Sequence, residues 1–150
     1  MSGNALDAVL DPELETKVRR LIANDSVEDI VEYDVSDAKL YGRRNRRVLS
    51  GELAKSAEAA GCVAEVYESV YWWTFGGVPV KPYGVYLLMP RQVCDDPDGD
   101  ADQYRAIRLS DDWGWYARHF VIGMIMFGLF ISVCVASLAM AFERNRRGDG

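Results

Sequence analysis

The sequence FVIGMIMFGLFISVCVASLAMAF, residues 120–142, decides the architecture of this chain. Its 23 residues include no charged side chain, proline, asparagine or glutamine. At about 1.5 Å per residue, such a helix measures roughly 35 Å and crosses the roughly 30 Å hydrocarbon core of a bilayer. Helices in soluble cores rarely contain so long an apolar run. The stretch therefore predicts one membrane-spanning helix and a single-pass membrane protein.

Small residues recur every four positions in this span, at Gly128, Ser132 and Ala136. Such small-xxx-small spacing lets the backbones of two membrane helices approach each other closely. We therefore expect these three residues to pack against the helix of a partner subunit.

Aromatic and polar residues flank the span. Trp and Tyr favour the headgroup layer, and long polar side chains at a membrane boundary reach toward headgroups. The residues expected at the membrane interface are Trp113, Trp115, Tyr116, Arg118, His119 and Arg144. His119 is the only histidine of the chain, so we interpret it as an interfacial residue rather than a metal or haem ligand.

The charge of the chain is divided unevenly. Residues 1–117 carry 13 Lys and Arg against 21 Asp and Glu, a net charge of −8, whereas residues 118–150 carry 4 against 2, a net charge of +2. An acidic domain repels nucleic-acid phosphates, which argues against a nucleic-acid partner. Three arginines precede the span and three follow it within about twenty residues, so the orientation stays open.

Helical patterns dominate the N-terminal half. Asp11 and Pro12 predict a helix start, followed by apolar residues at helical spacing. Residues 26–29 resemble a capping box that opens another turn. Ser50 is expected to cap a longer helix whose apolar stripe runs through residues 51–71. These patterns predict a helical head.

Residues 34–50 are expected to form a loop with a positive patch. The patch consists of Arg43, Arg44, Arg46 and Arg47. It suits docking on anionic lipid headgroups or on an acidic partner surface, and a solvated loop that neutralises nearby acids is the alternative.

Two adjacent tryptophans, Trp72 and Trp73, cannot both face one core from a single helical face. At least one is expected at a membrane interface or a partner. The alternative is that both wrap around a small core.

Prolines at positions 79, 82 and 90 exclude a regular helix after Gly77 and predict an extended, apolar arm. We expect this arm to lie on the head's own helices or on a neighbouring subunit, with a short strand at 84–89 as an alternative.

The aspartates from Asp95 to Asp102 lack the glycine and glutamate of an EF-hand loop. They predict a solvated acidic turn, and an irregular cation site is the alternative.

The cysteines are Cys62, Cys94 and Cys134, and the last lies in the span. We expect free thiols, and a bridge between Cys62 and Cys94 stays open. The first thirty residues lack a secretory apolar run and are too acidic for a mitochondrial transit peptide, so whether a leader was removed also stays open.

Together these patterns predict a mainly α fold with a small helical head, an extended Pro-rich arm and one C-terminal transmembrane helix. The expected segments are an acidic helical head (1–75), an arm with an acidic loop (76–103), a segment that leads into the membrane (104–119), the transmembrane helix (120–142) and a basic tail (143–150).

The chain presents no catalytic constellation, no glycine-rich phosphate loop and no ionisable residue within the span. We therefore expect a protein that is not an enzyme and that has no cofactor, metal or small-molecule substrate. In layout the chain resembles the supernumerary single-span subunits of mitochondrial respiratory and ATP synthase complexes, although no family motif matches.

The resemblance implies a non-catalytic accessory subunit of a multi-subunit complex, in first place a mitochondrial inner-membrane respiratory complex, that supports assembly and stability. Its partners would be other membrane-protein subunits, and anionic lipids are further candidate ligands. The alternative is a tail-anchored adaptor or receptor with a cytosolic N-terminal domain, because eight residues follow the span. Which complex the protein joins stays open.

Overall fold

The computed structural model describes residues 10–33, 37–92 and 101–148. Within these ranges the chain forms three helices and five strands. In chain order they are α1 (Pro12–Ala23), β1 (Glu28–Tyr33), β2 (Ala38–Val48), α2 (Gly51–Ala59), β3 (Glu65–Phe75), β4 (Val78–Pro90), β5 (Ala101–Arg108) and α3 (Trp113–Gly148).

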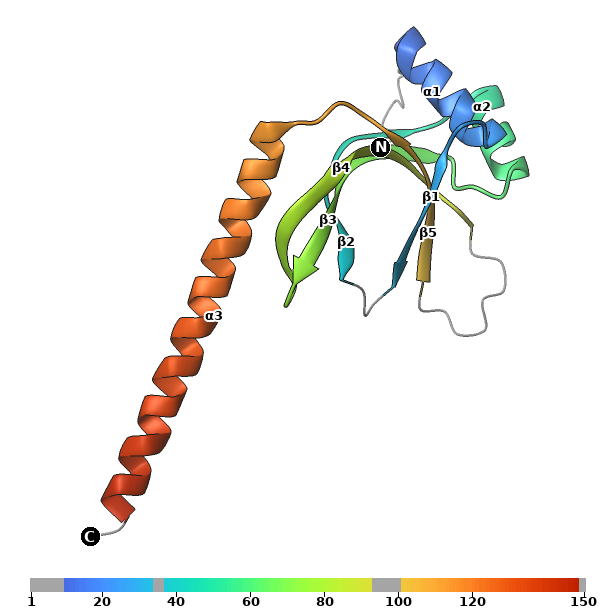
Figure 1. The fold of residues 1–150 in the computed structure, drawn as a ribbon. Coiled ribbons are helices and arrows are strands. Elements are labelled where there is room, and N and C mark those ends of the chain that lie inside the picture. Colours follow the sequence, from blue (N-terminus) through green and yellow to red (C-terminus); the bar gives the residue numbers. More distant parts are fainter. Residues whose placement is uncertain (1–9, 34–36, 93–100, 149–150) are drawn as a thin grey trace, which may run out of the picture.

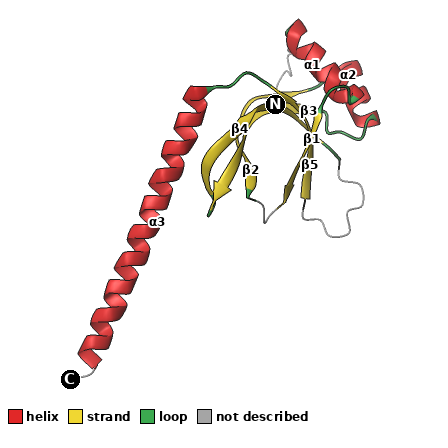
Figure 2. Ribbon diagram, in the orientation of Figure 1, coloured by secondary structure: helices red, strands yellow, loops and turns green. Residues whose placement is uncertain are grey.

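The five strands form one antiparallel sheet in the order β1-β5-β4-β3-β2. The sheet bends into an arch, with α1 and α2 together on the outside of the bend (Figure 1). Helix α3 leaves the arch as a long rod that descends beside the β3–β4 side of the sheet (Figure 2). The head is therefore a mixed α/β domain built around a sheet.

The expectation of a mainly α fold is wrong. The helix predicted over residues 51–71 ends at Ala59, where Gly61 takes a left-handed φ of 71°, and the rest of that segment is strand β3. Residues 26–29 do not open a helical turn; β1 begins at Glu28. The loop expected at 34–50 is mostly strand β2, because Arg44 and Val48 pair with residues of β3.

The arm expected at residues 76–103 is also wrong in its first part, which is the 13-residue strand β4. Pro79 and Pro82 lie in the half of β4 that pairs with β3 but not with β5. Proline lacks a backbone N–H, so it is tolerated where a strand has a free edge. The register shifts at these prolines, which absorbs the missing donors.

Two predicted helices are confirmed. Helix α1 begins at Pro12, and the Asp11 carboxylate accepts a hydrogen bond from the Glu13 N–H across 3.0 Å. The predicted span lies within α3, which from Trp113 to Arg146 is long and apolar enough to cross a membrane. Because 6% of its most apolar stretch is buried, α3 is not the core helix of this domain.

The sheet buries residues on both faces. The outer face packs against α1 and α2 through Val18, Leu21, Ala57, Val66 and Leu87. The inner face carries Tyr67, Tyr86, Leu88 and Tyr104, all buried. The edges of the arch approach each other where the Leu40 N–H donates to Glu32 Oε1 across 3.4 Å. Curvature of the sheet thus buries its inner face.

Candidate functional site

Arg44, on strand β2, makes two ion pairs and a ring contact that join separate elements of the chain. Its Nε donates to Glu68 Oε2 across 2.8 Å, and its Nη1 donates to Asp112 Oδ2 across 2.7 Å. Its guanidinium carbon also lies 3.8 Å from the centre of the Trp115 ring. Arg44 therefore ties β2 and β3 to the beginning of α3.

Asp112 holds the first turn of α3 from its N-terminal side. Its Oδ1 accepts a hydrogen bond from the Trp115 N–H across 3.0 Å, as an N-terminal cap does. That backbone donor and the Arg44 side chain lower the pKa of the Asp112 carboxyl. Burial acts to lower the pKa of Arg44, but Asp112 and Glu68 outweigh it and raise that pKa. Both groups are therefore charged at neutral pH.

Aromatic side chains pack the start of α3 onto the outer face of the sheet. Trp72 of β3 is 1% exposed and Tyr116 of α3 is 5% exposed, and their rings meet edge to face with centroids 5.8 Å apart. Val70 and Val85 complete this cluster. The Tyr116 hydroxyl donates to Asp111 Oδ1 across 2.7 Å. The helix therefore leaves the head through a packed contact and not through a free linker.

His119 lies one turn beyond Trp115 and is fixed from the sheet. The indole N–H of Trp72 donates to His119 Nδ1 across 3.3 Å. A Cβ on Gly42 would lie 2.9 Å from His119 Nε2, and Gly42 has a left-handed φ of 71°. The close approach of β2 to α3 therefore requires glycine at this position.

The turn between β3 and β4 also touches α3. A Cβ on Gly123 would lie 2.7 Å from Cδ of Pro79, so the turn and the helix are in direct contact there. The Tyr41 hydroxyl donates to the Gly77 carbonyl across 2.7 Å and braces the turn. Near the turn, Phe75 is 67% exposed. An apolar tip of the head thus lies beside the first turns of the span.

Two hollows adjoin this contact and share His119 and Ile122. The first has a volume of about 520 Å³ and is polar, with Arg44, Asp112 and Arg118 in its lining. The second has a volume of about 680 Å³ and lies between the β3–β4 turn and α3. Its lining consists of Tyr41, Gly76, Gly77, Val78, Pro79, His119, Ile122, Gly123, Met126, Phe127 and Phe130.

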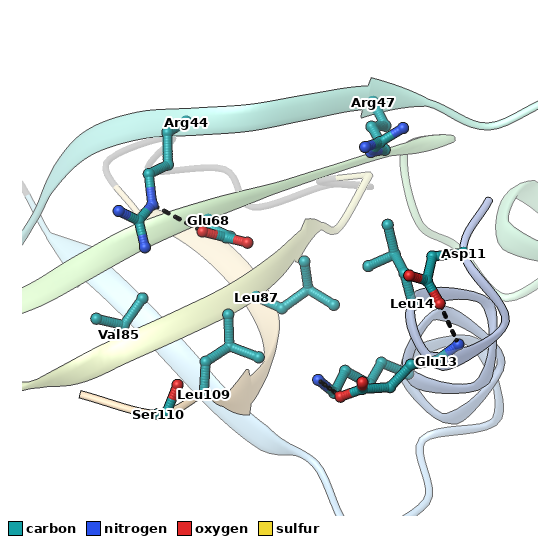
Figure 3. A pocket seen from close by; sticks show the side chains of 11 residues that line it. Asp11, Glu13, Leu14, Arg44, Arg47, Glu68, Val85, Leu87, Leu109 and Ser110 are labelled. Atoms are coloured by element: carbon teal, nitrogen blue, oxygen red, sulfur yellow. Dashed lines mark hydrogen bonds and ion pairs between the residues drawn. The ribbon is translucent and has the colours of Figure 1, made fainter. Parts of the chain in front are cut away.

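A third hollow, of about 360 Å³, separates α1 from β2 on the outer face of the sheet. Arg44 and Glu68 form an ion pair on one side of it, and Asp11 caps α1 on the other (Figure 3). Its charged groups of both signs already serve the fold. In the residues that the structure describes, no three His, Cys, Asp or Glu side chains gather to hold a metal ion.

The four arginines predicted as one docking patch have different neighbours in the structure, and their role in docking stays a prediction. Arg44 is held by Glu68 and Asp112, and Arg46 forms a two-pronged ion pair with Glu65 at 2.7 and 2.6 Å. Arg43 lies over the Tyr67 ring at 4.8 Å, and Arg47 lines the hollow beside α1. Strand geometry alternates side chains between faces, which separates neighbours in sequence.

The tryptophan pair is divided in the same way. Trp72 is a core residue, whereas Trp73 is 37% exposed and is the member of the pair that faces solvent or a partner. On α3, Trp113 and Arg118 are exposed, Trp115 and His119 are partly buried, and Tyr116 is buried. Arg144 is exposed at the other end of the helix.

The predicted helix-packing residues lie together on α3 below the head. Gly128, Ser132 and Ala136 are all exposed, and no atom lies within 4 Å of a Cβ built on Gly128. The Ser132 hydroxyl donates to the Gly128 carbonyl across 2.8 Å, so it is satisfied within its own helix. This row of small residues is available for contact with another helix.

Two predictions, one about the cysteines and one about the acidic turn, extend beyond the described residues. Cys62 is buried, and burial raises the pKa of its thiol. Cys94 and the acidic turn from 95 to 100 lie outside the described residues. The expectations of a free Cys94 thiol and of a solvated acidic turn, with a Cys62–Cys94 bridge and a cation site as their alternatives, therefore stay predictions.

The sequence did not indicate three residues of the junction, the contact between the sheet and the first turns of α3. Glu68 and Gly42 gave no signal because their partners lie far away in sequence. Gly123 gave a weak one, a glycine near the start of an apolar helix. The ion pair between Asp112 and Arg44 joins residues 68 positions apart and also gave no local signal.

No protein-family model, no curated protein and no solved structure matches this chain.

Proposed function

We propose that the protein is a non-catalytic accessory subunit of a multi-subunit membrane complex, anchored by α3. The observation that carries this proposal is the combination of an apolar helix without cover and a head packed rigidly onto its first turns. A helix held in this way transmits its orientation in the bilayer directly to the head. Such an arrangement suits a subunit that braces its neighbours inside the membrane and outside it.

The small residues of α3 supply the partner contact in this proposal. With 3.6 residues per turn, Gly128 lies about 140° around the helix from Gly123, the residue that touches the head. Gly128, Ser132 and Ala136 therefore point away from the β3–β4 turn and toward a neighbouring helix. The head leaves this face of α3 open.

Placement in a mitochondrial inner-membrane respiratory complex belongs to the same proposal and depends on layout alone. The chain shares with that layout the aromatic residues before the span, the span itself and the short basic tail. The helical head of that layout is replaced by a sheet. Fractionation of organelles from the native cell, with protease protection of the head, tests the location and the orientation together.

The partner role is tested by purifying the tagged full-length protein in mild detergent and resolving it on a native gel. We expect a stoichiometric assembly of high mass, and Ala136→Leu should release the protein from it. Ala141→Leu is the matched control, because residue 141 lies about 140° around the helix from Ala136. Carbonate extraction should show that both variants remain inserted. A free or dimeric wild-type protein would contradict the accessory role and would favour an anchored adaptor.

A further inference from the structure

The hollow between the β3–β4 turn and α3 has a mainly apolar lining, and the neighbouring polar hollow has Arg118 in its lining. Its lower lining is apolar, with Met126, Phe127 and Phe130 on the helix side. At its upper end it joins the polar hollow through His119 and Ile122, and Arg118 lines that polar hollow. The two hollows together form a groove along α3, polar at the end near Arg118 and apolar at the end near Phe130.

The position of this groove matches one leaflet of a bilayer. From His119 to Phe130 the helix rises about 16 Å, close to half of the roughly 30 Å hydrocarbon core. The apolar part begins where the polar residues of α3 end, at Phe120. The volume of about 680 Å³ falls within the range of about 300–1,000 Å³ that is typical of sites for small molecules.

The charged side chains at the polar end of the groove indicate which kind of molecule it binds. Arg44 is engaged by Glu68 and Asp112. Arg118, by contrast, is exposed and makes no ion pair with any residue that the structure describes. A cation without a partner at the headgroup level attracts anionic lipid headgroups.

We infer that this groove binds one anionic phospholipid of the surrounding leaflet. The phosphate lies near Arg118, and one acyl chain runs down between the β3–β4 turn and the side chains of Met126 and Phe130. Contact of Pro79 with Gly123 holds the turn against the helix and gives the groove its second wall. The inference depends on the insertion of α3 in a membrane but not on the accessory role, because the small-residue face lies on another side of the helix.

Native mass spectrometry of the full-length protein in detergent tests this site, with phosphatidylglycerol and phosphatidylcholine added in equal amounts. We expect one retained phospholipid per chain, with phosphatidylglycerol preferred about fivefold, the effect of one basic side chain near anionic headgroups. Arg118→Gln should abolish the preference, whereas Arg144→Gln at the far end of α3 should retain it. Equal retention of the two lipids by the wild type would overturn the inference.

A second pair of variants tests the apolar wall. Met126→Trp fills the groove and should remove the retained lipid, whereas Leu138→Trp, at an exposed position of the same helix, should leave it in place. Unchanged retention in Met126→Trp would overturn the inference. Carbonate extraction and the native gel are run on the same variants. Loss of lipid with an intact assembly, or loss of the assembly with lipid retained, separates this inference from the proposed accessory role.

Discussion

The indole N–H of Trp72, on strand β3, donates a hydrogen bond to Nδ1 of His119 on the helix that leaves the head, across 3.3 Å. The two residues are 47 positions apart in the chain. Since Trp72 is buried, the bond fixes the rotation of α3 relative to the sheet. The head and the span therefore act as one body at this contact.

Gly42 should be essential for this contact. Gly42→Ala places a Cβ 2.9 Å from His119 Nε2 and forces alanine into a left-handed backbone. We expect a loss of about 2–4 kcal/mol in the free energy of unfolding, from strain and overpacking together. Thermal unfolding in detergent, followed by tryptophan fluorescence, measures the loss.

Gly61→Ala is the control for that substitution. Gly61 has the same φ of 71°, but no atom lies within 4 Å of its Cβ position. Gly61→Ala should lower the free energy of unfolding by about 1–2 kcal/mol, the cost of the backbone strain alone. Equal losses in the two variants would contradict a tight contact between β2 and α3.

Arg44→Met should loosen the start of α3. The substitution leaves Glu68 and Asp112 without their shared cation and removes the contact with the Trp115 ring. We expect a loss of about 1–2 kcal/mol, because the site is partly exposed and belongs to a network. Arg46→Met breaks a single pair at a more exposed side chain. Arg46→Met should cost less than Arg44→Met, because solvent screens an exposed ion pair, and a larger loss than in Arg44→Met would argue against the network.

Gly123→Ala should push the β3–β4 turn away from α3. Its Cβ would lie 2.7 Å from Pro79 Cδ, a distance that requires one of the two elements to move. We expect faster amide hydrogen exchange at Gly76, Gly77 and Val78. Gly128→Ala meets no atom within 4 Å and should leave exchange in the turn unchanged. Identical exchange in both variants would show that the turn does not lie on the helix.

Glu32 should make the head less stable as the pH rises. Burial raises the pKa of its carboxyl above 4.5, although the Leu40 N–H acts in the opposite direction. The folded protein then binds a proton more tightly than the unfolded chain does. This stability is fully present below pH 4.5 and is lost as the pH rises through the folded pKa.

Glu32→Gln retains an oxygen that can accept from Leu40 and removes this titration. The variant should be at least as stable as the wild type at pH 7, and its stability should fall less steeply from pH 4.5 upward.

Asp112→Asn tests a pKa shift of the opposite sign. The pKa of Asp112 is lowered from 3.8, so its stabilising effect is present above that value and is lost as the pH falls through the folded pKa. Unfolding curves measured across this range compare the two.

Elements whose signals are local can be predicted from the amino-acid sequence alone. The cap at Asp11 and Pro12 defines α1, because a side-chain acceptor and a pre-set φ act within one turn. The uncharged length of residues 120–142 defines the span, because no partner is needed to make that segment apolar.

The sheet and its contact with the first turns of α3 depend instead on pairings between residues that are far apart in the sequence. Residues 65–72 alternate between two faces that are both at least partly buried, so they lack the polar–apolar alternation of a half-exposed strand and also fit a helical stripe. Pro79 and Pro82 argue against a strand until β5 is seen to end before it reaches them. The arginines of β2 form one cluster in the sequence, but in the folded sheet Arg44 and Arg46 form ion pairs with different carboxylates of β3. In each case the deciding partner lies on another strand, and local sequence does not encode a neighbour that only folding brings close.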